Sequence, residues 1–158
     1  MGIFNLFRSL FGSNTRETAR ISVLGQNIDI PSKEHNPRYN ELIGYTELLE
    51  HFKRSTEEYG KVQSVLHRYE PSSHTRPMGA EQSHIRLLEQ QVIKRAEFIQ
   101  VREQFIDLFE KLEPWLMEQE RLPQNEGEYA KQLLKMGMDV LEQAQKALPI
   151  RRLKWNNL

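Results

Sequence analysis

Residues 85–115 read IRLLEQQVIKRAEFIQVREQFIDLFEKLEPW and carry two apolar stripes at helical spacing. One stripe comprises Ile85, Leu88, Val92, Ala96, Ile99, Ile106 and Phe109, and the other comprises Phe98, Val101, Phe105, Leu108, Leu112 and Trp115. A helix with two apolar stripes packs against two neighbours, so this segment is predicted to be the central helix of the fold. Its expected range is about residues 81–121, and Pro114 should kink or restart it.

One further helix is predicted on each side of this segment. The first, about residues 37–69, follows the N-cap candidate Asn36 and has Pro37 at its first position. Its apolar line comprises Leu42, Tyr45, Leu49, Phe52, Thr56, Tyr59, Gln63 and Leu66. The other, about residues 125–148, starts with Asn125 and Glu128 as a capping-box pair. Short connectors make consecutive helices antiparallel, so residues 37–148 are expected to form an up-down-up three-helix bundle, and the chain is predicted to be mainly α.

A small β-hairpin is predicted before the bundle, within residues 14–36. Residues 20–31 read RISVLGQNIDIP, and Gly25-Gln26 between two β-branched runs is typical of a two-residue type II′ loop. This loop would pair Val23 with Ile28 and Ile21 with Ile30, and all four side chains would share one face. Because an isolated hairpin is marginally stable in water, that face is expected to pack on the helices or on a partner.

A separate short amphipathic helix is predicted within residues 1–13. Six apolar side chains fall within about 160° of arc, and they are Ile3, Phe4, Leu6, Phe7, Leu10 and Phe11. This face suits insertion into a membrane headgroup interface, packing on the protein's own body, or binding to a groove on a partner protein. The segment is too short for a secretory signal, and N-myristoylation is set aside because its motif has Ser or Thr where this chain has Leu6.

The charge of the chain is segregated, although 22 basic residues balance 22 acidic ones. Residues 1–38 carry five bases and three acids, residues 39–148 carry fourteen and nineteen, and residues 149–158 carry three and none. That last segment is a basic, aromatic tail with Arg151, Arg152, Lys154 and Trp155, which would reinforce binding to an anionic membrane surface. The acidic body beside it argues against nucleic acid as a partner.

No catalytic, metal or cofactor site is predicted. The 158 residues include no cysteine, which excludes disulfides, thiolate nucleophiles and cysteine-ligated metals. Glu81 and His84 form a single ExxH motif, whereas a di-iron site needs two, and no phosphate-binding loop or nucleophile elbow is present. The connector residues His67, Glu70, His74 and Arg76 are the remaining candidate group for binding an anion or metal.

These observations predict a non-catalytic adaptor or scaffold in the cytoplasm, peripheral on the cytoplasmic face of a membrane. Its N-terminal helix would dock on the membrane, and the hairpin face and the outer strip of the long helices would bind a protein partner. One alternative is a soluble homo-oligomeric interaction module whose N-terminal helix packs on its own core. The other is an enzyme or ligand carrier with a site in the 67–84 connector.

Overall fold

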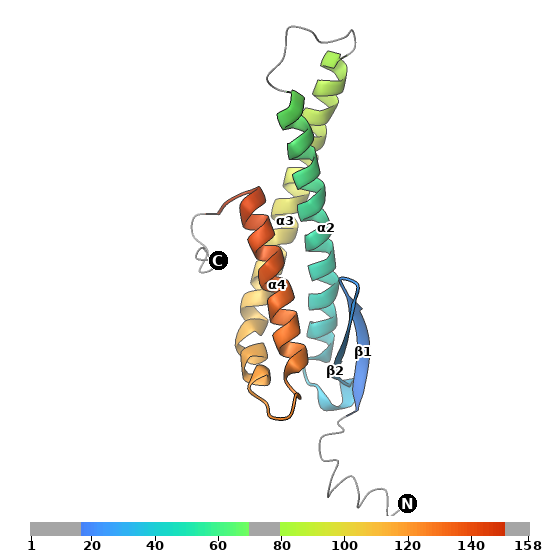
Figure 1. Cartoon of the computed structure of the whole chain (residues 1–158), viewed down its shortest axis with the longest axis vertical. Coiled ribbons are helices and arrows are strands. Elements are labelled where there is room, and N and C mark those ends of the chain that lie inside the picture. The colour runs from blue at the N-terminus through green and yellow to red at the C-terminus, as the bar shows by residue number, and fades with distance from the viewer. Residues whose placement is uncertain (1–16, 70–79, 151–158) are drawn as a thin grey trace, which may run out of the picture. The chain divides into compact units, whose positions relative to one another are not determined.

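The computed structural model describes residues 17–69 and 80–150, and within these ranges the chain is mainly helical. A two-stranded sheet, β1 (Thr18–Val23) and β2 (Gln26–Pro31), is followed by a short 3-10 helix, η1 (Lys33–His35). Three α-helices follow, α2 (Tyr39–Tyr69), α3 (Ala80–Glu120) and α4 (Glu128–Ala147) (Figure 1). The predicted hairpin and three long helices are therefore confirmed, and the separate helix predicted at residues 1–13 lies outside the described residues.

The described residues fall into two compact units. The first, called the hairpin unit, contains residues 17–47 and 108–137. The second, called the helical unit, contains residues 48–69, 80–107 and 138–150. Each long helix contributes one part to each unit, because the divisions fall inside α2, α3 and α4.

The turn of the hairpin differs from the predicted one by one position. Ile21 pairs with Ile28 and Val23 with Gln26, so the two-residue loop is Leu24-Gly25. Both loop residues have positive φ, 50° at Leu24 and 78° at Gly25, as a type I′ turn requires. The predicted Gly25-Gln26 loop is wrong because the type I′ turn needs its glycine at the second central position.

The predicted apolar face of the hairpin survives this change of register. Each residue of β1 pairs with a β2 residue two positions earlier than predicted, as Ile21 does with Ile28 in place of Ile30. Because side chains alternate between the two faces with period two, a shift of two positions leaves the same residues on one face. Val23, Ile28 and Ile30 are at most 1% exposed, and Ile21 is half-buried. The hairpin therefore uses its apolar face to build the core of its own unit.

Asn36 lies three residues before α2 and caps the turn that leads into the helix, which agrees with the predicted capping role. Its side-chain oxygen accepts a hydrogen bond from the backbone N–H of Arg38 at 3.0 Å, two positions on, which is the geometry of an N-cap. Its amide also donates to the carbonyl of Pro31 at 3.4 Å, and the residue is only 4% exposed. Asn36 thus joins the end of β2 to the first turn of α2.

Aromatic residues from α2 and α3 lie at the centre of the core of the hairpin unit. The rings of Tyr45 and Phe109 stack with centroids 6.4 Å apart. The Tyr45 hydroxyl donates to the backbone carbonyl of Leu133 on α4 at 2.8 Å. Tyr45 therefore connects all three helices within this unit.

The turn between α3 and α4 also differs from the prediction. Asn125 has φ 64°, in the left-handed region, whereas an N-cap residue has an extended backbone. The carbonyl of Gly127 instead accepts the first helical hydrogen bonds, from Ala130 and Lys131 at 3.1 and 3.2 Å. A Cβ atom at Gly127 would lie 2.0 Å from the carbonyl oxygen of Gln119, so the turn requires glycine there. The predicted N-cap at Asn125 is wrong.

Pro114 does not divide α3, which continues from Ala80 to Glu120. The proline side chain is exposed, so the carbonyl that loses its helical partner one turn earlier lies towards solvent. The predicted restart of the helix at this proline is therefore wrong.

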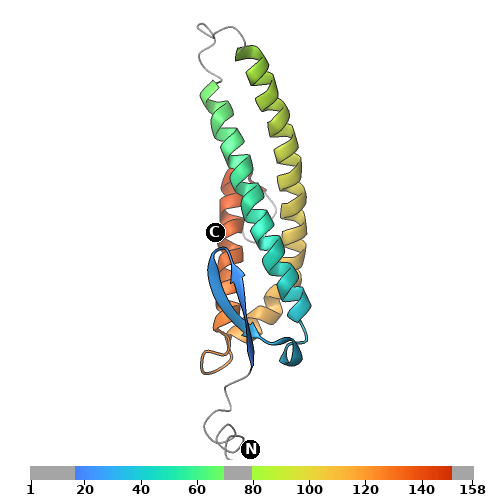
Figure 2. The same cartoon turned by 90° about the vertical axis from the view of Figure 1, so that its right-hand side faces the viewer.

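The helical unit is held together by aromatic pairs between α2 and α3. Phe52 contacts Phe105 and Phe98 with ring centroids 5.0 and 6.2 Å apart, and Tyr59 stacks on Phe98 at 5.2 Å. Because the later α2 residue pairs with the earlier α3 residue, the two helices run antiparallel in this unit, as Figure 2 shows. These rings are 0–1% exposed, so they form the core of the helical unit.

Candidate functional site

The residues predicted to contact a membrane or a partner lie outside the described part of the chain. They are Ile3, Phe4, Leu6, Phe7, Leu10 and Phe11 near one end, and Arg151, Arg152, Lys154 and Trp155 near the other. Their roles stay predictions. The described residues present a different apolar surface, on α3.

This surface, called the α3 strip, comprises Ile85, Leu88, Val92, Ile93 and Ala96. The four large side chains are 53%, 40%, 67% and 56% exposed, in that order, and Ala96 is also exposed. At 100° per residue, Ile85 and Val92 lie about 140° and 120° around the helix from Phe98, which faces α2. The strip therefore faces away from α2 and towards solvent.

The exposure of the α3 strip corrects the prediction that the whole first stripe of the central helix is covered. The C-terminal part of the same stripe behaves as predicted, since Ile106 and Phe109 are 9% and 0% exposed. Within the helical unit, α4 ends at Ala147, and Leu148 lies against Arg102 of α3. Earlier residues of α3 have α2 as their helical neighbour (Figure 2), and their part of the first stripe is exposed.

Arg102 is a buried cation that the sequence analysis missed. It is 5% exposed, its guanidinium lies 4.8 Å from the ring centroid of Phe98, and its Nη1 donates to the carbonyl of Leu148 at 2.5 Å. Burial lowers the pKa of Arg102, and its Nε has no hydrogen-bond partner. The available signal was a gap in the first stripe, because Arg102 occupies the helical position between Ile99 and Ile106.

Two buried hydroxyl groups of α2 donate hydrogen bonds to backbone carbonyls. Thr56 donates to the carbonyl of Phe52 at 2.7 Å, and Tyr45 donates to Leu133. Burial, with a smaller contribution from the charge of Glu113, raises the pKa of Tyr45 above its ordinary value. A phenol that stays protonated and bonded to a carbonyl is a structural group, which agrees with the predicted core position of Tyr45.

Of the histidines singled out by sequence, His67 and His84 lie within the described residues. Glu81 is exposed and His84 is half-buried on the first turns of α3, and the Nδ1 of His84 has no hydrogen-bond partner. His67 is exposed near the end of α2. The other connector candidates, Glu70, His74 and Arg76, lie outside the described residues.

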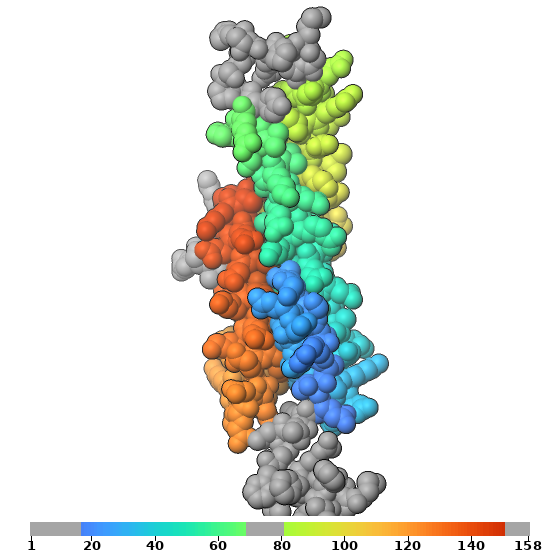
Figure 3. Space-filling view, turned by 45° about the vertical axis from the view of Figure 1, so that its right-hand side comes forward, coloured from blue at the N-terminus to red at the C-terminus, as the bar shows by residue number. Residues whose placement is uncertain are grey.

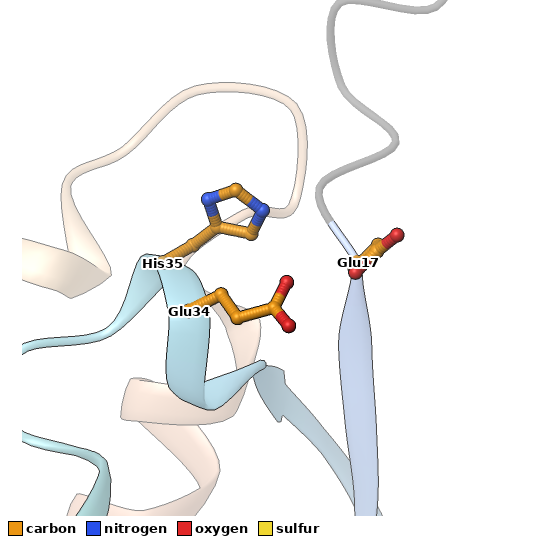
Figure 4. A group of neighbouring side chains, drawn as sticks. All are labelled: Glu17, Glu34 and His35. Carbon is orange, nitrogen blue, oxygen red and sulfur yellow. The ribbon is translucent and has the colours of Figure 1, made fainter.

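One cluster of potential metal ligands joins Glu17, Glu34 and His35, a set that the sequence analysis missed (Figure 4). Their ligand atoms lie within 4.8 Å of one another, and the N–H of Ser32 donates to the carbonyl of Glu17 at 3.0 Å, which brings the two segments together. The spacing in sequence gave no signal, because the hairpin separates Glu17 from the other two. All three side chains are exposed and well hydrated, so we assign the group no ion.

The chain matches no protein-family model, no curated protein and no solved structure. No helix in the described ranges is long and apolar enough to cross a lipid bilayer.

Proposed function

We propose that this protein is a non-catalytic adaptor that binds a protein partner through the α3 strip and docks on a membrane surface through residues 1–11. The strip is the observation that carries the proposal. Four large aliphatic side chains on one side of a helix are 40–67% exposed to water, and covering the exposed part of each would contribute about 0.5–2 kcal/mol. A contiguous apolar surface of this kind on a polar protein is typical of an interaction site.

The proposed architecture for this role is an up-down-up three-helix bundle. It is supported in the helical unit by the Phe52–Phe105 and Tyr59–Phe98 pairs, whose order along the chain shows that α2 and α3 run antiparallel there. Separately, the hairpin unit contributes the bond from Tyr45 to Leu133. The apolar face of the hairpin is buried, so the partner surface is proposed on α3 alone and no longer on the hairpin face.

A soluble homo-oligomer is the second candidate, and the charges along the α3 strip favour it. Along this part of α3, residues 81–97, the acids Glu81, Glu89 and Glu97 are balanced in number by the bases Arg86, Lys94 and Arg95. A neutral border lets a second copy approach without net repulsion, and a partner helix would complete the uncovered stripe.

Liposome co-sedimentation tests the membrane part of the proposal. Full-length protein, protein lacking residues 1–13 and the Val92→Gln/Ile93→Gln variant are mixed with vesicles that contain or lack anionic lipid. We expect the first and third proteins to pellet with anionic vesicles and the truncated protein to stay in the supernatant. If full-length protein stays in the supernatant, the membrane part is wrong.

Sedimentation velocity over a range of concentrations tests the surface on α3. A concentration-dependent oligomer that the Val92→Gln/Ile93→Gln variant abolishes would establish the second candidate, with a second copy on the strip. A wild-type monomer would support the adaptor, whose strip is then free for a different protein. An oligomer that the variant leaves intact would place self-association on another surface and contradict the second candidate.

A further inference from the structure

A cleft lies in the helical unit where α4 ends beside α2. Its volume is about 590 Å³, and it is lined by Gly60, Gln63, Ser64, His67 and Arg68 of α2 and by Lys146 and Ala147 of α4. The cleft exists because α4 ends at Ala147 while α2 continues to Tyr69. Figure 3 shows the green surface of α2 continuing past the red end of α4.

One face of α2 forms the floor of this cleft. The five α2 residues have the spacing i, i+3, i+4, i+7 and i+8, which places them on one side of the helix. Gly60 leaves the floor open, because a Cβ atom built there meets nothing within 4 Å. The floor is polar along its length, in contrast to the apolar strip on α3.

The lining of the cleft is basic. Arg68 and Lys146 each carry a positive charge, and His67 adds a third group that can do so. None of the described residues that line the cleft has a carboxylate. Glu142 lies one turn before Lys146 and pairs with it at 3.6 Å, but it does not line the cleft. Ser64 and Gln63 add neutral hydrogen-bond donors.

A second, independent observation concerns Arg102, beside the same end of α4. Its guanidinium is 5% exposed and bonds the carbonyl of Leu148, the residue after Ala147. Among the described residues no carboxylate forms an ion pair with Arg102, and its Nε lacks an acceptor. Its charge, which Glu103 on the same helix offsets in part, adds to the positive potential around the end of α4.

We propose that this cleft binds a small phosphate-bearing anion, a polyphosphate or a multiply phosphorylated small molecule. Arginine and lysine side chains are the usual protein donors to phosphate oxygens, and the hydroxyl of Ser64 can complete the set. The volume lies in the range of ligand pockets and exceeds the space that one phosphate fills. The lining of the cleft includes no residue of the α3 strip and none of residues 1–11, so the proposal goes beyond the adaptor function.

The competing explanation is that these bases only stabilise the negative C-terminal ends of α2 and α4. That role needs no ligand and predicts no specific binding. Isothermal titration of the full-length protein with sodium tripolyphosphate separates the two explanations. We expect saturable 1:1 binding with a dissociation constant below about 1 mM at low salt, which corresponds to about 4 kcal/mol.

Two variants with the same change in net charge locate the binding. Arg68→Gln/Lys146→Gln removes the two permanent charges of the cleft and should weaken tripolyphosphate binding at least tenfold. Arg54→Gln/Lys61→Gln removes one arginine and one lysine from exposed positions of α2 outside the lining, and should change binding less than twofold. Absence of wild-type binding, or an equal loss in both variants, would overturn the proposal. Circular dichroism checks that both variants stay folded.

The phosphate groups can belong to a soluble molecule or to a lipid headgroup. Vesicles containing a phosphoinositide, with and without competing tripolyphosphate, distinguish these sources in protein lacking residues 1–13. Binding that tripolyphosphate displaces, and that Arg68→Gln/Lys146→Gln weakens, assigns the cleft to a headgroup. Binding of free tripolyphosphate without binding of vesicles assigns it to a soluble anion.

Discussion

The Nη1 atom of Arg102 on α3 lies 2.5 Å from the carbonyl oxygen of Leu148, the first residue after α4. A cation at this place satisfies a carbonyl that the helix leaves free and opposes the negative end of the helix dipole. The stem of the same side chain is buried, with its guanidinium over the ring of Phe98. Arg102 therefore holds the end of α4 against α3 within the helical unit.

Replacement of Arg102 should separate its packing from its charge. Arg102→Ala removes the buried stem as well as the hydrogen bond, so we expect the free energy of unfolding to fall by about 2–3 kcal/mol. Arg102→Met keeps most of the volume and removes a buried charge that has no ion-pair partner. We therefore expect Arg102→Met to lower the free energy of unfolding by less than about 1 kcal/mol. Urea denaturation measures both. Equal losses would show that the charge, and not the packing, provides the stability.

The buried phenol of Tyr45 predicts a fall in stability at alkaline pH. Because burial raises its pKa in the folded state, the unfolded chain loses the proton first as the pH rises through 10.0. The unfolded state then binds fewer protons than the folded state, so above pH 10 the free energy of unfolding falls by about 1.4 kcal/mol per pH unit from this group. Below pH 10 the contribution is fully present.

Tyr45→Phe should remove this part of the alkaline slope and also lower the stability at neutral pH by about 1 kcal/mol, because the hydrogen bond to Leu133 is lost. Tyr39→Phe, at a half-buried position, is the control and should keep the slope. Urea midpoints between pH 8 and 11 measure both effects. A slope unchanged by Tyr45→Phe would show that Tyr45 ionises freely.

The helices were predictable because their signal is local. Apolar spacing of three and four residues identifies α2, α3 and α4, and the burial of Tyr45, Phe52, Phe98 and Phe105 follows from it. The cap at Asn36 was predictable for the same reason, since an Asn-Pro pair acts within one turn.

The remaining features depend on contacts between distant segments. The position of Gly127 is set by the backbone of Gln119, so the sequence of the turn alone favoured Asn125 as the cap. The covered length of α3 depends on where α4 ends, which decides that Ile106 is buried and Val92 is exposed. The same short α4 also leaves the basic cleft open beside α2, and the sequence pattern of α2 alone does not predict this cleft.

Two glycines should respond in opposite directions to alanine. Gly60 lies inside α2 with open space around it, so Gly60→Ala should raise the free energy of unfolding by about 1 kcal/mol. Gly127→Ala should lower it by about 2–3 kcal/mol, because the new Cβ must displace the backbone of Gln119. Gly44 also lies in α2, with no atom within 4 Å of an added Cβ, so Gly44→Ala should raise the free energy of unfolding by as much as Gly60→Ala does. Thermal and urea unfolding of the three variants test the prediction, and a neutral Gly127→Ala would contradict the turn.

The α3 strip should be dispensable for folding, unlike the aromatic face of the same helix. Val92 and Ile93 are 67% and 56% exposed, so Val92→Gln/Ile93→Gln should change the free energy of unfolding by less than about 1 kcal/mol. Phe98→Ala, by contrast, should lower it by about 3–5 kcal/mol, because Phe98 is fully buried between Phe52 and Tyr59. Denaturation at low protein concentration isolates these effects from association. If the double glutamine variant unfolds as readily as Phe98→Ala under those conditions, the strip belongs to the core and its role as a docking surface is wrong.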